Sequence, residues 1–65
     1  MFIVIEIQKT GDTVSTLVNS YTDYKEAASK YHTILSYAAK SEQDIHSAVI
    51  LDEYGNNITN ESYSK

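Results

Sequence analysis

The 65-residue sequence has no cysteine and no proline, and its five basic residues are all lysine. Without cysteine the chain has no disulfide, no thiolate zinc ligand and no thiol nucleophile. Without arginine, and with its lysines scattered singly, it lacks the basic cluster that binds a phosphate backbone, so we expect no general nucleic-acid binding. Its two glycines lie in turn sequences, and neither belongs to a phosphate-binding loop.

The small size of the chain bears on how it is stabilised. Sixty-five residues predict a single domain, 1–65, near the lower limit at which one core offsets the entropy of ordering a chain. A chain this short without disulfides often gains stability by burying surface against copies of itself. We therefore expect a homo-oligomer, either a dimer or a larger assembly.

The N-terminal stretch MFIVIEIQK is apolar for about seven residues, which is too short to span a bilayer. It also lacks the basic region and the small-residue cleavage site of a signal peptide. The formal net charge is −4. We expect a soluble, cytoplasmic protein without membrane association, and we interpret the stretch as a strand.

Alternation of apolar and polar residues predicts strands at about 2–8, 13–21, 45–53 and 57–63. In the first strand Ile3, Ile5 and Ile7 share one face, while Phe2 and Val4 lie on the other. Apolar residues on both faces indicate a central strand. The second strand is more polar, which favours a place nearer an edge.

A helix is predicted at about 24–40, with Asp23 as its N-cap and Glu26 three residues on. Apolar residues recur at steps of three and four, the spacing of one helix face. They are Tyr24, Ala27, Ala28, Tyr31, Ile34, Leu35 and Ala38.

The element order is ββαββ, an α+β fold. A right-handed crossover through the helix can set the third strand beside the first, which predicts a four-stranded antiparallel sheet of order 2-1-3-4. One helix can cover only one face of this sheet. We expect a second copy of the chain to cover the remaining apolar surface, through the helix flank or the open sheet face.

The candidate ligand-binding or interface residues begin with the two histidines, His32 and His46. His32 lies on the helix flank beside small residues that leave room for another backbone or a flat ligand. A structural role is the simpler interpretation of His32, and a structural or interface role is favoured over catalysis for His46. Two histidines without a third ligand make a poor metal site. Exposed tyrosines give large contact area with a polar tip. The complete candidate set is His32, Ala28, Ser36, Ala39, His46, Tyr37, Tyr21 and Tyr54.

The residues do not suggest an enzyme. Asp52 and Glu53 are adjacent in a predicted strand and therefore point to opposite faces, which is wrong for paired carboxylates acting on one bond. The serines lack the context of a nucleophile elbow. We expect no catalytic residues, no cofactor and no metal.

One pattern covers most of the chain from residue 21 to 63 and resembles short, uncharacterised phage and prophage proteins of gut Firmicutes. The residues that carry the resemblance are Glu26-Ala27, Lys30-Tyr31-His32-Thr33-Ile34-Leu35, Ala38-Ala39, Ser41, His46-Ser47-Ala48, Gly55 and Glu61-Ser62-Tyr63. The resemblance implies an accessory protein of a mobile element that works in the host cytoplasm. Such proteins often block host defence.

These considerations lead to one main functional hypothesis and two alternatives. The main hypothesis is a homo-oligomeric counter-defence protein, a sponge that sequesters a nucleotide-derived immune signal. An acidic inhibitor that occludes a host defence protein would instead use the negative charge of the chain. A structural or assembly role in the phage particle is the third possibility.

Overall fold

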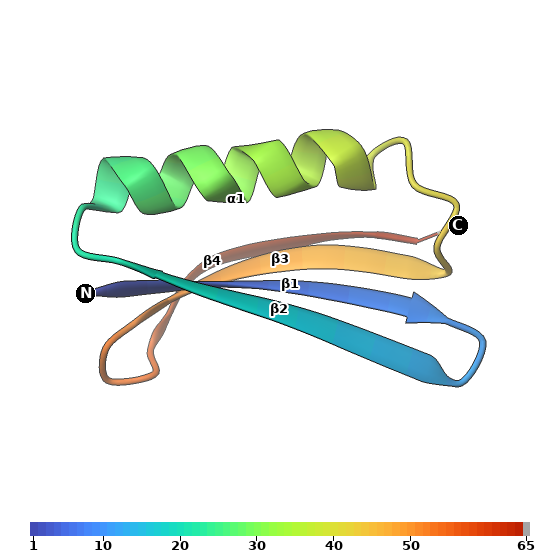
Figure 1. The fold of residues 1–65 in the computed structure, drawn as a ribbon, viewed down its shortest axis with the longest axis horizontal. Helices are drawn as coiled ribbons and strands as arrows, with labels where there is room; N and C mark the ends of the chain where they lie inside the picture. Colours follow the sequence, from blue (N-terminus) through green and yellow to red (C-terminus); the bar gives the residue numbers. More distant parts are fainter. Residues whose placement is uncertain (65) are drawn as a thin grey trace.

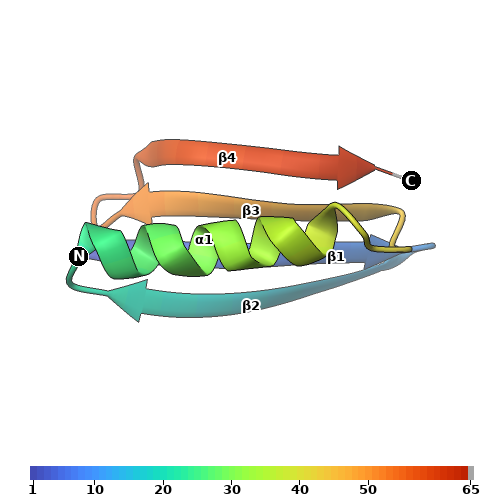
Figure 2. The ribbon, with the colours of Figure 1, turned by 90° about the horizontal axis from the view of Figure 1, so that it is seen from above.

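The computed structural model describes residues 1–64 as one antiparallel sheet with a helix across one face (Figures 1 and 2). The strand order is β2-β1-β3-β4, and every neighbouring pair is antiparallel. The α+β fold and the strand order are therefore as predicted. The elements are β1 (Phe2–Thr10), β2 (Thr13–Tyr21), α1 (Tyr24–Ala38), β3 (Ile45–Asp52) and β4 (Asn57–Ser64).

The first two strands form a hairpin that is tighter than expected. β1 continues to Thr10 rather than ending near residue 8, and Thr10 pairs with Thr13. The two residues between them include Gly11, whose φ is 60°. A positive φ at the first loop position suits a two-residue hairpin turn, and glycine adopts it without the strain that a Cβ would cause.

The two ends of α1 are organised differently. At the N-terminus the Asp23 side chain accepts a hydrogen bond from the Lys25 backbone N–H at 3.0 Å, so Asp23 is the N-cap as predicted. The helix ends at Ala38 and not at residue 40. The next turn tightens, because the Lys40 and Ser41 N–H groups donate to carbonyls three residues back, at 3.1 Å each.

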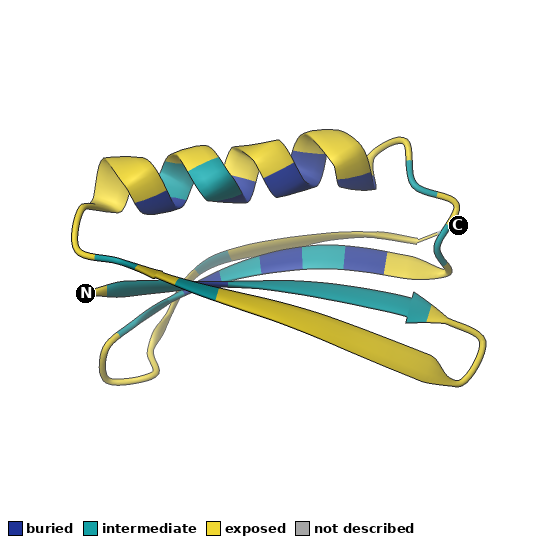
Figure 3. Cartoon of the chain, in the orientation of Figure 1, coloured by how far each residue is buried: buried dark blue, intermediate teal, exposed yellow. Residues whose placement is uncertain are grey.

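The core lies between α1 and the two central strands, β1 and β3 (Figure 3). Its largest fully buried side chains are Ile50 and Val4. From the helix come Ala27, Tyr31, Ile34 and Leu35. Because side chains alternate along a strand, the residues between the buried positions of β1 and β3 lie on the other side of the sheet.

That other side, which we call the outer face, is apolar at its centre, and within residues 1–64 no helix lies over it (Figure 1). Val18 on β2 is 60% exposed and Val14 is 59% exposed. The apolar residues of the outer face come from the central strands β1 and β3 and from the edge strand β2. They include Ile3, Ile5, Ile7, Val14, Val18, Val49 and Leu51. The expectation that one helix would leave one sheet face bare is therefore confirmed.

Within residues 1–64, no helix is both long and apolar enough to cross a membrane.

Candidate functional site

A buried polar cluster lies on the helix-covered face of the two central strands. The β1–β3 register sets Gln8 opposite His46 and Glu6 opposite Ala48, so Glu6 and His46 are diagonal neighbours. His46 Nε2 lies 2.6 Å from Glu6 Oε2. Gln8 Nε2 donates to the same carboxylate oxygen at 3.0 Å.

This cluster is shielded from water. The side chains of His46 and Glu6 are only 7% and 14% exposed. The other ring nitrogen, His46 Nδ1, is buried without a hydrogen-bond partner within the described residues. A buried polar atom without a partner costs free energy, so the Glu6 contact carries the whole compensation for burying the imidazole. The arrangement presents neither group to a substrate, so we regard it as a structural pair.

The helix flank that bears His32 faces β4. Tyr31 Oη lies 3.5 Å from Thr59 Oγ1 on β4, which fixes the direction of this flank. The exposed His32 ring packs edge-on against the Tyr31 ring, with centroids 5.4 Å apart and planes at 72°. The helical period places Ala28, Ser36 and Ala39 along the same flank. The structure thus groups four of the predicted residues beside a held aromatic ring.

Ser36 lies on the same flank, one helical turn from His32, whereas Tyr37 does not. The Ser36 hydroxyl donates to the Thr33 carbonyl at 2.9 Å, which occupies its donor within the helix. Tyr37 is 69% exposed. Its position about 140° around the helix from His32 puts it on the opposite flank, toward β2.

The remaining predicted residues are spread over the molecule. Tyr21 ends β2, opposite Phe2, and packs against the core. Tyr54 is 84% exposed in the β3–β4 turn. His46 lies in the buried cluster, in surroundings different from those of His32. The structure therefore does not gather the eight predicted residues into one site within a single chain.

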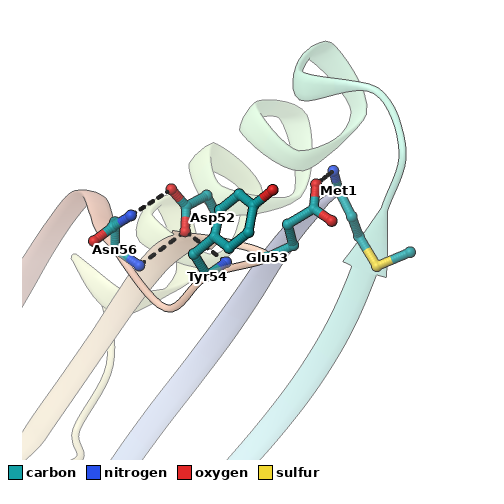
Figure 4. Close-up of polar contacts among 5 residues, drawn as sticks. All are labelled: Met1, Asp52, Glu53, Tyr54 and Asn56. Carbon is teal, nitrogen blue, oxygen red and sulfur yellow. Dashed lines mark hydrogen bonds and ion pairs between the residues drawn. The ribbon is translucent and has the colours of Figure 1, made fainter.

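The β3–β4 turn is ordered by one carboxylate (Figure 4). Asp52 Oδ1 accepts hydrogen bonds from the Tyr54 and Asn56 backbone N–H groups at 2.9 and 2.8 Å, and Oδ2 accepts from Asn56 Nδ2 at 3.0 Å. These bonds, that of the Asn56 side chain first, hold the pKa of Asp52 below its ordinary value. Beside the turn, Glu53 Oε1 binds the Met1 ammonium at 3.3 Å.

The sequence interpretation missed Glu6, which lies on the helix-covered face of β1 together with Phe2, Val4 and Gln8. Its position between Val4 and Gln8 marks it as inward-facing, and an inward carboxylate needs a partner. Among residues 1–64 no pocket is detected, and no three potential ligand side chains are grouped closely enough to hold a metal ion.

Comparisons with protein-family models, with curated proteins and with solved structures find no significant match.

Proposed function

We propose that this chain is a non-enzymatic accessory binding protein that works as a homo-oligomer, in which copies cover each other's outer faces. The observation that supports this most directly is the outer face itself. Its centre is made of isoleucine, valine and leucine side chains, and its only charged residue on β1 is Lys9, at one end. Contiguous apolar surface of this kind is typical of an interaction site.

The size of the outer face sets the area that a second copy could cover. The sheet is spanned by the longest and the shortest dimensions of the molecule, 33 and 15 Å, so one face covers about 500 Å² and two facing copies would bury about 1,000 Å² (Figure 2). This area lies at the lower limit of specific protein–protein interfaces. Two sheets packed face to face, about 10 Å apart, would interdigitate their apolar rows.

The test is the mass of the purified protein in solution, measured by light scattering coupled to size exclusion. One chain has a mass of 7.3 kDa, and we expect a multiple of it at micromolar concentration. Val49→Glu places a charge at the centre of the outer face, opposite Ile5, and should halve the mass or reduce it to that of one chain. Tyr37→Glu, on the exposed helix, is the matched control and should leave the mass unchanged. A folded wild-type monomer would contradict the proposal.

For the ligand we propose the nucleotide-derived signal that the resemblance implies, held at the helix flank of Ala28, His32 and Ala39. The observations that support this ligand site concern the residues around His32. The His32 ring is exposed and is held by Tyr31, and small residues on either side leave room for a flat base. A panel of nucleotides should include one that raises the melting temperature of wild type but not of His32→Ala. Tyr37→Ala is the control, and a panel without any shift would contradict the assignment.

A second candidate function, occlusion of a host protein, is favoured by the β3–β4 turn. Three hydrogen bonds to Asp52 fix this turn while it displays Tyr54, and an ordered, exposed tyrosine is a common anchor of protein interfaces. If this candidate is correct, a co-purifying partner should be lost with Tyr54→Ala and retained with His32→Ala. The nucleotide proposal predicts that neither variant affects a protein partner.

A further inference from the structure

The two edges of the sheet differ in how well they are protected from further strand pairing. β2 forms one edge with nine residues, TVSTLVNSY, that contain no charge and no proline. Its register with β1 is regular from end to end. β4 forms the other edge, carries Glu61, and has a register shift where it passes Ile50 and Leu51. Charges and bulges are the usual features that block edge pairing, and β2 has neither.

The backbone of β2 offers a regular set of free hydrogen-bonding groups. The Asp44 N–H donates to the Lys9 carbonyl at 2.8 Å, so the odd-numbered residues of β1 direct their backbone groups toward β3. Even-numbered residues of β1 therefore bond to β2, and their β2 partners are odd-numbered. The residues of β2 whose N–H and C=O groups point away from the sheet are Val14, Thr16, Val18 and Ser20.

We propose that β2 pairs antiparallel with β2 of a second copy, joining two sheets into one of eight strands. The register centred on Leu17 uses every free backbone group. It pairs Val14 with Ser20 of the other copy and Thr16 with Val18 of the other copy. Leu17 then lies opposite its own counterpart across the two-fold axis. Its side chain is 60% exposed in the single chain, and this contact would cover it.

The same strand favours a second copy over other partners. Pairing of β2 with β2 is isologous and closes at two chains, whereas pairing of β2 with β4 would continue into an open filament. The bulge and Glu61 oppose that filament. The paired sheet also joins two outer faces into one continuous apolar surface. If two such paired sheets pack outer face against outer face, as proposed above, the assembly contains four chains. The β2–β2 contact and the outer-face contact do not depend on each other.

Amide hydrogen exchange, followed by NMR on the wild-type protein, tests the edge pairing without any substitution. We expect the amides of Val14, Thr16, Val18 and Ser20 to exchange at least roughly a hundredfold more slowly than in an unstructured peptide. The amides of Ser15 and Leu17 bond to β1 in any case, so they are the internal control for an intact hairpin. Exchange of the four outward amides at the unstructured rate, with the control amides protected, would overturn the inference.

Substitutions distinguish this contact from the outer-face contact. Thr16→Pro removes an outward N–H that β1 does not use, and an edge strand accommodates proline at such a position. It should halve the mass of the assembly, while Thr16→Ala should not. Leu17→Glu sets two carboxylates opposite each other in the pair and should have the same effect, whereas Leu17→Gln should have a smaller one. Circular dichroism checks that each variant is folded.

The outcomes separate the two proposals. If Val49→Glu lowers the mass but Thr16→Pro and Leu17→Glu do not, the edge pairing is wrong and the outer-face contact stands. If only the β2 variants lower the mass, the edge pairing stands and the outer-face contact is wrong. If both kinds of variant halve it, both contacts exist.

Discussion

The pair formed by Glu6 and His46 allows a prediction about stability that depends on its geometry. We consider three variants: His46→Leu, Glu6→Met and the double variant that carries both. Each single change leaves one polar partner buried, whereas the double change removes both and fills much of the same volume with apolar atoms. Breaking a buried pair is expected to cost more than replacing it.

The two single variants should not cost the same. In His46→Leu the carboxylate keeps the hydrogen bond from Gln8 and is 14% exposed, so we expect a loss of about 2 kcal/mol. In Glu6→Met the imidazole loses its only partner, because Nδ1 is already unpaired, and its side chain is 7% exposed. We therefore expect about 3 kcal/mol. The double variant should lose less than Glu6→Met alone.

Urea unfolding followed by circular dichroism measures these differences. A domain of 65 residues has a total stability of roughly 3 to 10 kcal/mol, and a urea slope near 1 kcal/mol per M. The Glu6→Met midpoint should therefore fall by about 3 M, which can leave it unfolded in buffer. Gln8→Ala is the control and should cost about 1 kcal/mol. If the losses of the two single variants simply add in the double variant, the two side chains do not interact and the reasoning is refuted.

Three further predictions concern the helix cap and the turns. Asp23→Ala should lower the free energy of unfolding by about 1 kcal/mol and Asp23→Asn by much less, because asparagine still accepts from the Lys25 N–H; urea midpoints report both. The lowered pKa of Asp52 means that its carboxylate stabilises the fold above about pH 4 and loses this effect as the pH falls through the folded pKa. The melting temperature of Asp52→Asn should therefore drop less than that of wild type between pH 6 and 2.5, and an equal drop would contradict this assignment. Gly11→Ala should cost about 1 kcal/mol from its φ of 60° alone, since an added Cβ meets no atom within 4 Å; a neutral result in thermal melting would show that the turn relaxes.

Much of the fold could be predicted because the apolar residues of each element recur at a single spacing, every second residue in a strand and every three to four residues in the helix. The apolar residues on both sides of β1 indicated a central strand, and the polar β2 indicated an edge, as the sheet order shows. The end of α1 was predicted two residues late, since Ala38, Ala39 and Lys40 all favour a helix and no local residue stops it. The irregular pairing of β4 opposite Ile50 and Leu51 leaves no trace in the sequence pattern.

The candidate site was harder to predict because it depends on register and on direction around the helix. His46 was correctly placed at the start of the third strand, yet its partner Glu6 lies 40 residues away and is found only once β1 and β3 are aligned. The flank residues Ala28, His32, Ser36 and Ala39 were grouped by helical period alone. Whether they bind a ligand or a second copy is still a prediction.

The central position of β1 has a consequence for synthesis on the ribosome. β1 is synthesised before β2, β3 and β4 but lies between two of them, and its second neighbour, β3, follows about 40 residues later, since Ile5 pairs with Val49. Before β3 and β4 leave the ribosome, only β1 and β2, two of the four strands of the sheet, are available to pair with each other and to pack against the helix. The sheet can therefore be completed only after β3 and β4 have left the ribosome, and its rate is set by that late, distant pairing rather than by the helix.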